Sequence, residues 1–159
     1  MANNPIITLT TDFGYRDPLA GIMKGVILSI NPDVNIVDIT HGISKYNVRE
    51  SALTIGMSYH EFPSSTIHVV VTDPGVGSER RPIMVVTEDY YFIGPDNGVF
   101  SIVYSESERC EVLHLTAEHY FMRDKSATFH GRDVFAPVAS WLSKGVISSK
   151  FGDPVTDFV

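Results

Sequence analysis

A chain of 159 residues, of which 43% are hydrophobic and 19% charged, has the composition of a single folded globular domain, which excludes disordered and fibrous classes. The formal net charge of −7, without a basic run, argues against nucleic-acid binding and favours a small or cationic partner. The single cysteine, Cys110, excludes a disulfide framework within the chain and a cysteine-rich zinc site. Neither a membrane-spanning apolar run nor a signal-peptide pattern is found, so we expect a cytoplasmic protein.

The first half of the chain alternates β-rich apolar runs with helical patterns. Apolar residues at helical spacing follow Pro18 and stop before Asn31-Pro32. The strongest strand signal is the β-branched run 67–71, which ends abruptly in Asp73-Pro74-Gly75. In chain order, the predicted elements are a strand over 6–11, a helix beginning at Pro18, a strand over 34–39, a helix over 48–60 and a strand over 67–71.

The second half predicts an antiparallel pair of strands and one clear helix. The strands cover 83–87 and 90–93, and the helix begins near Arg132, kinks at Pro137 and ends at Gly145. All these elements together predict an α/β fold, a three-layer domain with a largely parallel central sheet flanked by helices, over residues 1–145. We expect residues 146–159 to be a linker or tail without a completed element.

Polar residues follow the predicted strands at the points where those strands end. In open α/β sheets, ligands bind outside the carboxyl ends of the strands. Asp12, with Asp17 close behind, follows the first strand, His41 follows the second and Asp73 the third. An ionised carboxylate there can accept hydrogen bonds from vicinal hydroxyls or pair with an ammonium group, whereas the alternative role of Asp12 is to cap a turn or helix.

The loop from Asp73 to Arg80 places a carboxylate and a guanidinium at the two ends of a glycine-bearing segment. An ion pair would hold the pKa of Asp73 low and keep the carboxylate available to orient water. The alternative is a turn with a surface salt bridge worth under about 1 kcal/mol. Arg81 is a second candidate for the cation, although its position before Pro82 indicates the start of a strand.

Two further side chains are candidates for chemistry or binding. His130 lies at the predicted entrance of the last helix, where the helix dipole favours a neutral imidazole that can accept or relay a proton. Tyr46 can stack on a base or a sugar. The alternatives are a surface histidine and an aromatic ring that covers the edge of the core. The remaining histidines are not spaced as metal ligands usually are, so the sequence supports a metal site only weakly.

Five separated segments, in order along nearly the whole chain, closely resemble the S-adenosylmethionine hydroxide adenosyltransferases, relatives of fluorinase and chlorinase: LTTDFGYRDPLAGIMKG, VDITHGISKYNVRESA, VVVTDPGVGSERR, FIGPDNGVFS and TFHGRDVFAP. The resemblance implies hydrolysis of S-adenosylmethionine by water attacking its 5′ carbon, which gives adenosine and L-methionine without a cofactor. It implies that Asp73, Arg80 and His130 activate the water.

The same resemblance assigns the substrate-binding residues. Asp12 falls at the ribose-binding carboxylate, Asp17 near the methionine end, and Tyr46 at an aromatic position against the nucleoside. Asn97 and Phe129 are expected to complete the pocket. Family members continue into a β-rich C-terminal domain, and in their homotrimers each site lies between two subunits. We therefore expect residues 146–159 to lead toward such a domain, and the chain alone to bind ligand weakly.

Other functions remain as alternatives at this point. The halogenase relatives carry tyrosine where this sequence has Asp73, whose charge would repel a halide, so a halide-using adenosyltransferase is the second interpretation within the family. A non-catalytic nucleoside or S-adenosylmethionine binding module would use Asp12, Asp17 and Tyr46 alone. A metal-dependent hydrolase would use Asp12, Asp73 and His41 as ligands.

Overall fold

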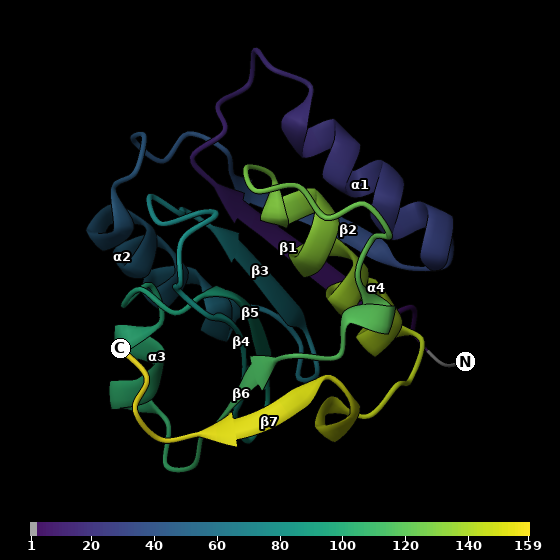
Figure 1. Cartoon of the computed structure of the whole chain (residues 1–159). Coiled ribbons are helices and arrows are strands. Elements are labelled where there is room, and N and C mark those ends of the chain that lie inside the picture. The colour runs from purple at the N-terminus through teal and green to yellow at the C-terminus, as the bar shows by residue number, and fades with distance from the viewer. Residues whose placement is uncertain (1–2) are drawn as a thin grey trace.

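The structure is a computed structural model that describes residues 3–159, and it is built around one seven-stranded sheet (Figure 1). The strands lie in the order β2-β1-β3-β5-β4-β6-β7. Their bounds are β1 Ile6–Thr11, β2 Asn35–Thr40, β3 Ile67–Val71, β4 Pro82–Val86, β5 Tyr91–Pro95, β6 Glu111–Leu115 and β7 Gly152–Val155. The α-helices are α1 Leu19–Ile30, α2 Val48–Ser58, α3 Ser101–Glu106 and α4 Ala136–Ser143. Short 3-10 turns cover Tyr59–Glu61, Glu118–Tyr120 and Ser148–Lys150.

The sheet is parallel at its centre and antiparallel toward one edge. β1 pairs in parallel with β2 and β3, and β3 with β5, whereas β4, β6 and β7 add antiparallel pairs. The chain leaves β1 toward β2 and returns past it to β3, so the strand order reverses between β1 and β3. A doubly wound sheet forms a crevice at such a reversal, outside the carboxyl ends of the two strands.

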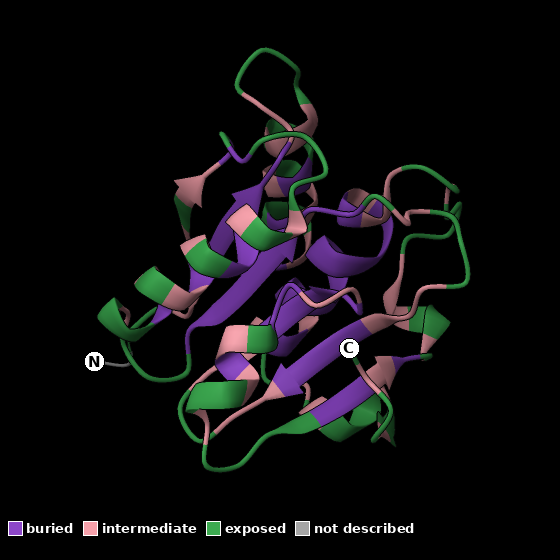
Figure 2. Ribbon diagram, turned by 90° about the vertical axis from the view of Figure 1, so that its left-hand side faces the viewer, coloured by how far each residue is buried: buried purple, intermediate pink, exposed green. Residues whose placement is uncertain are grey.

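Helices cover both faces of the sheet, which confirms the predicted three-layer α/β architecture. One apolar cluster joins α1 and α4 to the strands through residues such as Met23, Ile27 and Phe135, and a second joins α2 and α3 through Ile55 and Val103. Figure 2 shows the strands as the buried centre, with helices that bury one side and expose the other. Among residues 3–159, no helix is both long and apolar enough to cross a membrane.

The entry to the last helix is a π-helical turn, Gly131–Phe135, directly before α4. Pro137 has no N–H to give to the carbonyl of Asp133, as an α-helix would require. That carbonyl instead accepts the backbone N–H of Met122 at 2.9 Å. The predicted distortion at Pro137 is therefore present as this turn, and it ties the segment before His130 to the helix. The helix ends before Gly145, whose φ is +100°.

The C-terminal residues differ from the prediction. Residues 146–159, expected as a linker or tail, contain β7, which pairs antiparallel with β6 and forms one edge of the sheet. Phe151 is fully buried in the core beneath α4. No element was predicted at α3 or β6. The six residues of α3 are too few for a helical period to be read, and β6 has one β-branched residue where the equally long β3 has four. β7 contains Pro154, which reads as a strand breaker.

Candidate active site

A cavity of about 400 Å³ opens at the reversal point between β1 and β3, bounded by the π-helical turn and the loop before α2. It is the place that the doubly wound topology predicts for a ligand. Both acidic strand ends, Asp12 and Asp73, line it, as do Tyr46, Phe129 and His130. The other lining residues are Phe13, Leu19, Lys45, Val71, Val76, Ser126, Thr128, Gly131 and Arg132.

Asp73 and Arg80 form the buried ion pair that their loop spacing suggested. The Arg80 Nε donates to Asp73 Oδ1 at 2.8 Å, and its Nη2 contacts Oδ2 in the bidentate arrangement of a guanidinium and a carboxylate. Only 5% of the Asp73 side chain and 8% of the Arg80 side chain is exposed. The surface-salt-bridge alternative is therefore wrong, because both charges lie in the protein interior.

The loop that carries this pair folds back because of Gly77. Its φ is +79°, and a Cβ built there would lie 2.3 Å from the backbone oxygen of Ala127. Glycine alone permits both the left-handed conformation and the close approach. The contact packs the loop from Asp73 to Arg80 against the segment that leads to His130, and so joins the two parts of the site.

His130 completes a chain of three side chains. Arg80 Nη2 donates to His130 Nδ1 at 2.9 Å. Because arginine has no deprotonated form in proteins, Nδ1 must be the acceptor, and a neutral His130 carries its proton on Nε2. Desolvation, followed by the charge of Arg80, lowers the pKa of His130 below the ordinary value of 6.5. The ring is thus a neutral hydrogen-bond donor at neutral pH.

Arg80 also has one donor to spare. Its Nη1 is buried and has no hydrogen-bond partner among the described residues. A buried donor without a partner is costly. Arg81, the second candidate for the partner of Asp73, instead binds Asp96 and Asp157, so the structure selects Arg80.

Asp12 is held against the loop before α2. Its Oδ2 accepts the backbone N–H of Tyr46 at 2.8 Å, which leaves Oδ1 for another donor. Tyr46 has a φ of +61°, an uncommon conformation for a non-glycine residue, and its ring is exposed at the cavity rim beside the Lys45 ammonium. Strained backbone of this kind concentrates at ligand-binding sites.

The opposite wall is braced by the buried carboxylate of Asp133. Its Oδ2 accepts both the N–H and the hydroxyl of Ser126, at 2.8 and 2.7 Å, and its Oδ1 accepts Arg132 Nε at 2.7 Å. The hydroxyl of Ser126 in turn accepts the N–H of Phe129 at 3.0 Å. Phe129 then packs edge-to-face on Phe13, with ring centroids 5.7 Å apart. These contacts fix an aromatic wall beside His130.

Residues 7–152 match the model of the SAM (S-adenosylmethionine) hydroxide adenosyltransferase N-terminal domain. The chain belongs to the S-adenosylmethionine hydroxide adenosyltransferase family. An (R)-S-adenosyl-L-methionine hydrolase of Methanocaldococcus jannaschii is 44% identical over 85% of this chain and 52% of its own length. A fluorinase of an Actinoplanes species is 25% identical over 97% of this chain.

A solved family structure has the same fold. The crystal structure of an uncharacterized conserved protein from Thermotoga maritima superposes with a TM-score of 0.94 at 39% identity, over 96% of this chain and 59% of that one. The chain thus spans little more than half the length of the relatives it matches.

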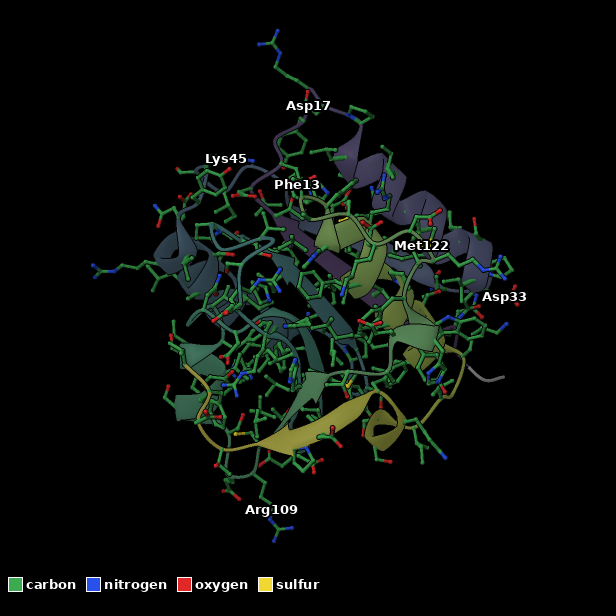
Figure 3. All side chains as sticks on the ribbon, in the orientation of Figure 1. Phe13, Asp17, Asp33, Lys45, Arg109 and Met122 are labelled. Atoms are coloured by element: carbon green, nitrogen blue, oxygen red, sulfur yellow. The ribbon has the colours of Figure 1, made fainter. Side chains whose placement is uncertain are left out.

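Two of the residues assigned by resemblance to this family do not reach the cavity. Asp17 is exposed in the loop between β1 and α1, and Figure 3 shows it beyond Phe13 at the outer end of that loop. The side chain of Asn97 is hydrogen-bonded to backbone groups: it donates to the Thr72 carbonyl at 2.9 Å and accepts the N–H of Val99. It lies in a separate groove between α2 and α3 and braces the end of β3.

The metal-hydrolase alternative receives no geometric support from the described residues. No group of three or more histidine, cysteine, aspartate or glutamate side chains among residues 3–159 is arranged to hold an ion. His41 does not line the cavity with Asp12 and Asp73. Both of its ring nitrogens form hydrogen bonds with other side chains: Nδ1 with Thr11 and Nε2 with Asp38.

Sequence reasoning missed several cavity residues. Ser126 and Thr128 lie in a stretch to which no element was assigned, and Arg132 was read as the first residue of a helix. Lys45 had no signal apart from its place next to Tyr46. The helpful signal was proximity: all four lie within a few residues of Tyr46 or His130, and Lys45, Thr128 and Arg132 lie in segments that already resembled the family.

Proposed function

We propose that this chain provides the water-activating half of an S-adenosylmethionine hydrolase site. The oxygen of water attacks the 5′ carbon, the bond from that carbon to sulfur breaks with its electron pair going to sulfur, and the products are adenosine, L-methionine and a proton. The observation that carries the proposal is that Asp73 and His130, which both line the cavity, are joined through the buried side chain of Arg80.

The leaving group explains why so few catalytic groups suffice. A thioether departs from a sulfonium as a neutral molecule, so it needs no general acid, and the reaction needs no cofactor. Water, in contrast, is a weak nucleophile that gains from orientation and from a proton acceptor. The carboxylate of Asp73 accepts a hydrogen bond, and then the proton, from that water.

Arg80 and His130 have different tasks in this proposal. Arg80 holds the Asp73 carboxylate in place through its bidentate contact. His130 Nδ1 is already occupied by Arg80, so the neutral ring offers Nε2–H as a donor rather than a second base. The geometry therefore supports Asp73 as the proton acceptor and His130 as a group that orients the water.

Substrate binding follows from the remaining lining residues. Asp12 offers its free Oδ1 to the ribose hydroxyls, and Tyr46 and Phe129 offer aromatic faces to the nucleoside. Asp17 and Asn97 receive no support from their positions. The exposed ring of Tyr46 at the rim supports completion of the site by further protein in a homotrimer, and the exposed, unpaired Cys110 supports a cytoplasmic setting.

The deciding experiment is incubation of the whole protein with S-adenosylmethionine in water enriched in heavy oxygen, with mass spectrometry of the nucleoside. Adenosine that carries the label on its 5′ oxygen, formed by the wild-type protein and not by Asp73→Asn, is the expected result. A 5′-halogenated nucleoside formed in added halide, without labelled adenosine, would move the function to the halide-using relatives. Binding of S-adenosylmethionine without any product would leave a binding module.

A further inference from the structure

His41 lies directly behind the ligand-facing loop and contacts it from three directions. Its Nδ1 is 2.8 Å from the hydroxyl oxygen of Thr11, its carbonyl accepts the N–H of Gly14 at 2.8 Å, and its own N–H donates to the Tyr15 hydroxyl at 3.1 Å. These partners lie on both sides of Asp12 and Phe13, which face the cavity. The histidine itself is 3% exposed and does not line the cavity.

The proton count of these contacts determines the form of the ring. The Asp38 carboxylate can only accept, so His41 Nε2, which lies 2.8 Å from Asp38 Oδ1, donates to it. In the neutral ring Nδ1 then accepts the Thr11 hydroxyl proton, while the Thr11 oxygen accepts the N–H of Phe13 at 3.2 Å. The hydrogen bonds thus run in one direction, from the Phe13 N–H through Thr11 and His41 to Asp38.

The outer end of this chain is held by a charge. Asp38 Oδ2 binds the Lys24 ammonium on α1 at 2.5 Å. Desolvation raises the pKa of Asp38, but hydrogen bonds from Lys24 and His41 outweigh it, so the net pKa lies below the ordinary value. A carboxylate that stays ionised keeps accepting from Nε2–H and so preserves the tautomer that receives the Thr11 hydroxyl.

We propose that His41, oriented by Asp38, is a positioning residue that acts through Thr11 to hold Asp12 and Phe13 in their ligand-binding places. The inference rests on the proposed function for its kinetic consequence, because Asp12 is the carboxylate assigned to the ribose. Loss of the contact loosens the loop and weakens ligand binding, while the water-activating groups on β3 and the π-helical turn stay in place. The signature is a raised KM with little change in kcat.

The same strand offers a matched control. Thr8, also on β1, bonds through its hydroxyl to Nδ1 of the buried His68 at 2.7 Å, within the aromatic cluster on the other face of the sheet. Thr8→Val deletes one buried threonine–histidine hydrogen bond with almost no change in side-chain volume. Thr11→Val deletes such a bond and also the acceptor of the Phe13 N–H. Neither Thr8 nor His68 lines the cavity. A purely structural effect of losing such a bond would appear in both variants.

The first measurements need no ligand. Imidazole nitrogen shifts by NMR should show His41 as the Nε2–H tautomer. Amide exchange at Phe13 should become faster in Asp38→Ala, which keeps the Thr11 acceptor of the Phe13 N–H, but not in Thr8→Val. In the whole protein, Thr11→Val should raise KM for S-adenosylmethionine about tenfold or more and change kcat by less than about threefold. Thr11→Ser, which keeps the hydroxyl, should restore KM, and Thr8→Val should lower the melting temperature alone.

The outcomes separate this inference from the proposed function. A folded Thr11→Val protein with unchanged KM, or an equal rise of KM in Thr8→Val, would overturn the positioning role. If the wild-type protein gives no turnover, the proposed function fails, while adenosine affinity and Phe13 exchange still decide the role of His41. If Thr11→Val does not fold, Asp38→Ala, which removes the acceptor of Nε2–H at a half-exposed site, should raise KM in the same direction.

Discussion

Two neighbouring arginines bind two buried aspartates at adjacent strand ends, with different consequences. Arg80 binds Asp73 after β3, and Arg81 binds Asp96 after β5, at 2.8 Å through Nη2. The two aspartate side chains are equally hidden, with 5% and 3% exposed. In the first pair, Asp73 lines the cavity and Arg80 contacts His130. In the second pair, Asp96 also accepts the N–H of Val159 and so holds the C-terminal residues against the sheet.

The difference between the pairs lies in what surrounds them. The second carboxylate oxygen of Asp96 accepts the backbone N–H of Val159, and Nη1 of Arg81 donates to Asp157. Asp73 lines the cavity, and Arg80 keeps a buried Nη1 without a hydrogen-bond partner among the described residues. A buried ion pair by itself is therefore weak support for function, and an incompletely satisfied pair at a cavity is stronger support.

The largest expected effect comes from breaking both pairs in the same way. Asp73→Asn leaves Arg80 without a charged partner and should cost on the order of 3 kcal/mol of unfolding free energy, whereas Asp96→Asn leaves Arg81 paired with Asp157 and should cost less. Only Asp73→Asn should also reduce kcat for S-adenosylmethionine hydrolysis, by about a hundredfold or more, because the proton acceptor is lost. Chemical denaturation and steady-state kinetics measure the two quantities.

Equal turnover by the two folded variants would remove the distinction between the pairs. A large loss in Asp96→Asn alone would mean that the C-terminal fastening, and not Asp73, controls the chemistry. The kinetic comparison is made per folded molecule, at a temperature below both transitions, because both variants lose stability.

A smaller effect is expected from the loop that carries Asp73 and Arg80. Gly77→Ala places a methyl group against the Ala127 carbonyl, so the loop and the segment before His130 must separate, and kcat/KM should fall about tenfold. Gly145→Ala meets the same left-handed φ but nothing within 4 Å of the new Cβ. That control should lose about 1 kcal/mol of stability and no activity. Equal kinetics for both variants would show that the loop contact is dispensable.

The effect that is smallest near neutral pH separates two histidines by their response to acid. Burial lowers the pKa of His68 from 6.5 to about 3. At pH values between these two, the unfolded chain binds a proton at His68 that the folded chain does not bind. Stability should therefore fall as pH decreases from about 6.5 toward 3, by on the order of 3 kcal/mol at pH 4, and level off below. Denaturation of wild-type and His68→Gln proteins at several pH values measures this contribution, which the variant should lack.

His130 should instead affect activity. Desolvation and the Arg80 charge lower its pKa, so kcat/KM should begin to fall only below pH 6.5, when the ring becomes protonated and loses its contact with Arg80. That acidic limb should persist in His68→Gln. A limb centred above pH 6.5 would contradict the arrangement in which Arg80 donates to His130.

Much of the site was predictable because it lies at strand ends. Asp12 and Asp73 follow two clear β-branched runs, and parallel strands bring such ends to one edge of a sheet. Arg80 followed from its place at the end of a glycine-bearing loop. The link to His130 was beyond local patterns, since it depends on Gly77 packing against Ala127, a contact between segments about fifty residues apart in sequence.

The unpredicted parts have two physical causes. α3 and β7 are short and β6 has one β-branched residue, so these elements are stabilised by tertiary contacts and not by local pattern. Asn97 was assigned through resemblance alone, and Asp17 through resemblance and its place after the first strand. Both signals give a position in sequence without the direction of a side chain. His41 was noted as a strand-end residue, but its contact with Thr11 became visible only when β1 and β2 were placed side by side.

β7 also determines how the sheet meets other molecules. A strand at an edge presents free backbone donors and acceptors, which invites pairing with a strand of another chain. β7 covers β6 and offers Pro154, which has no N–H, and the exposed Asp153 on a segment of four residues. The fourteen residues after Gly145 thus protect the sheet from edge-to-edge aggregation. A chain shortened at Gly145 would lose β7 and expose the backbone N–H and C=O groups of β6 that pair with it.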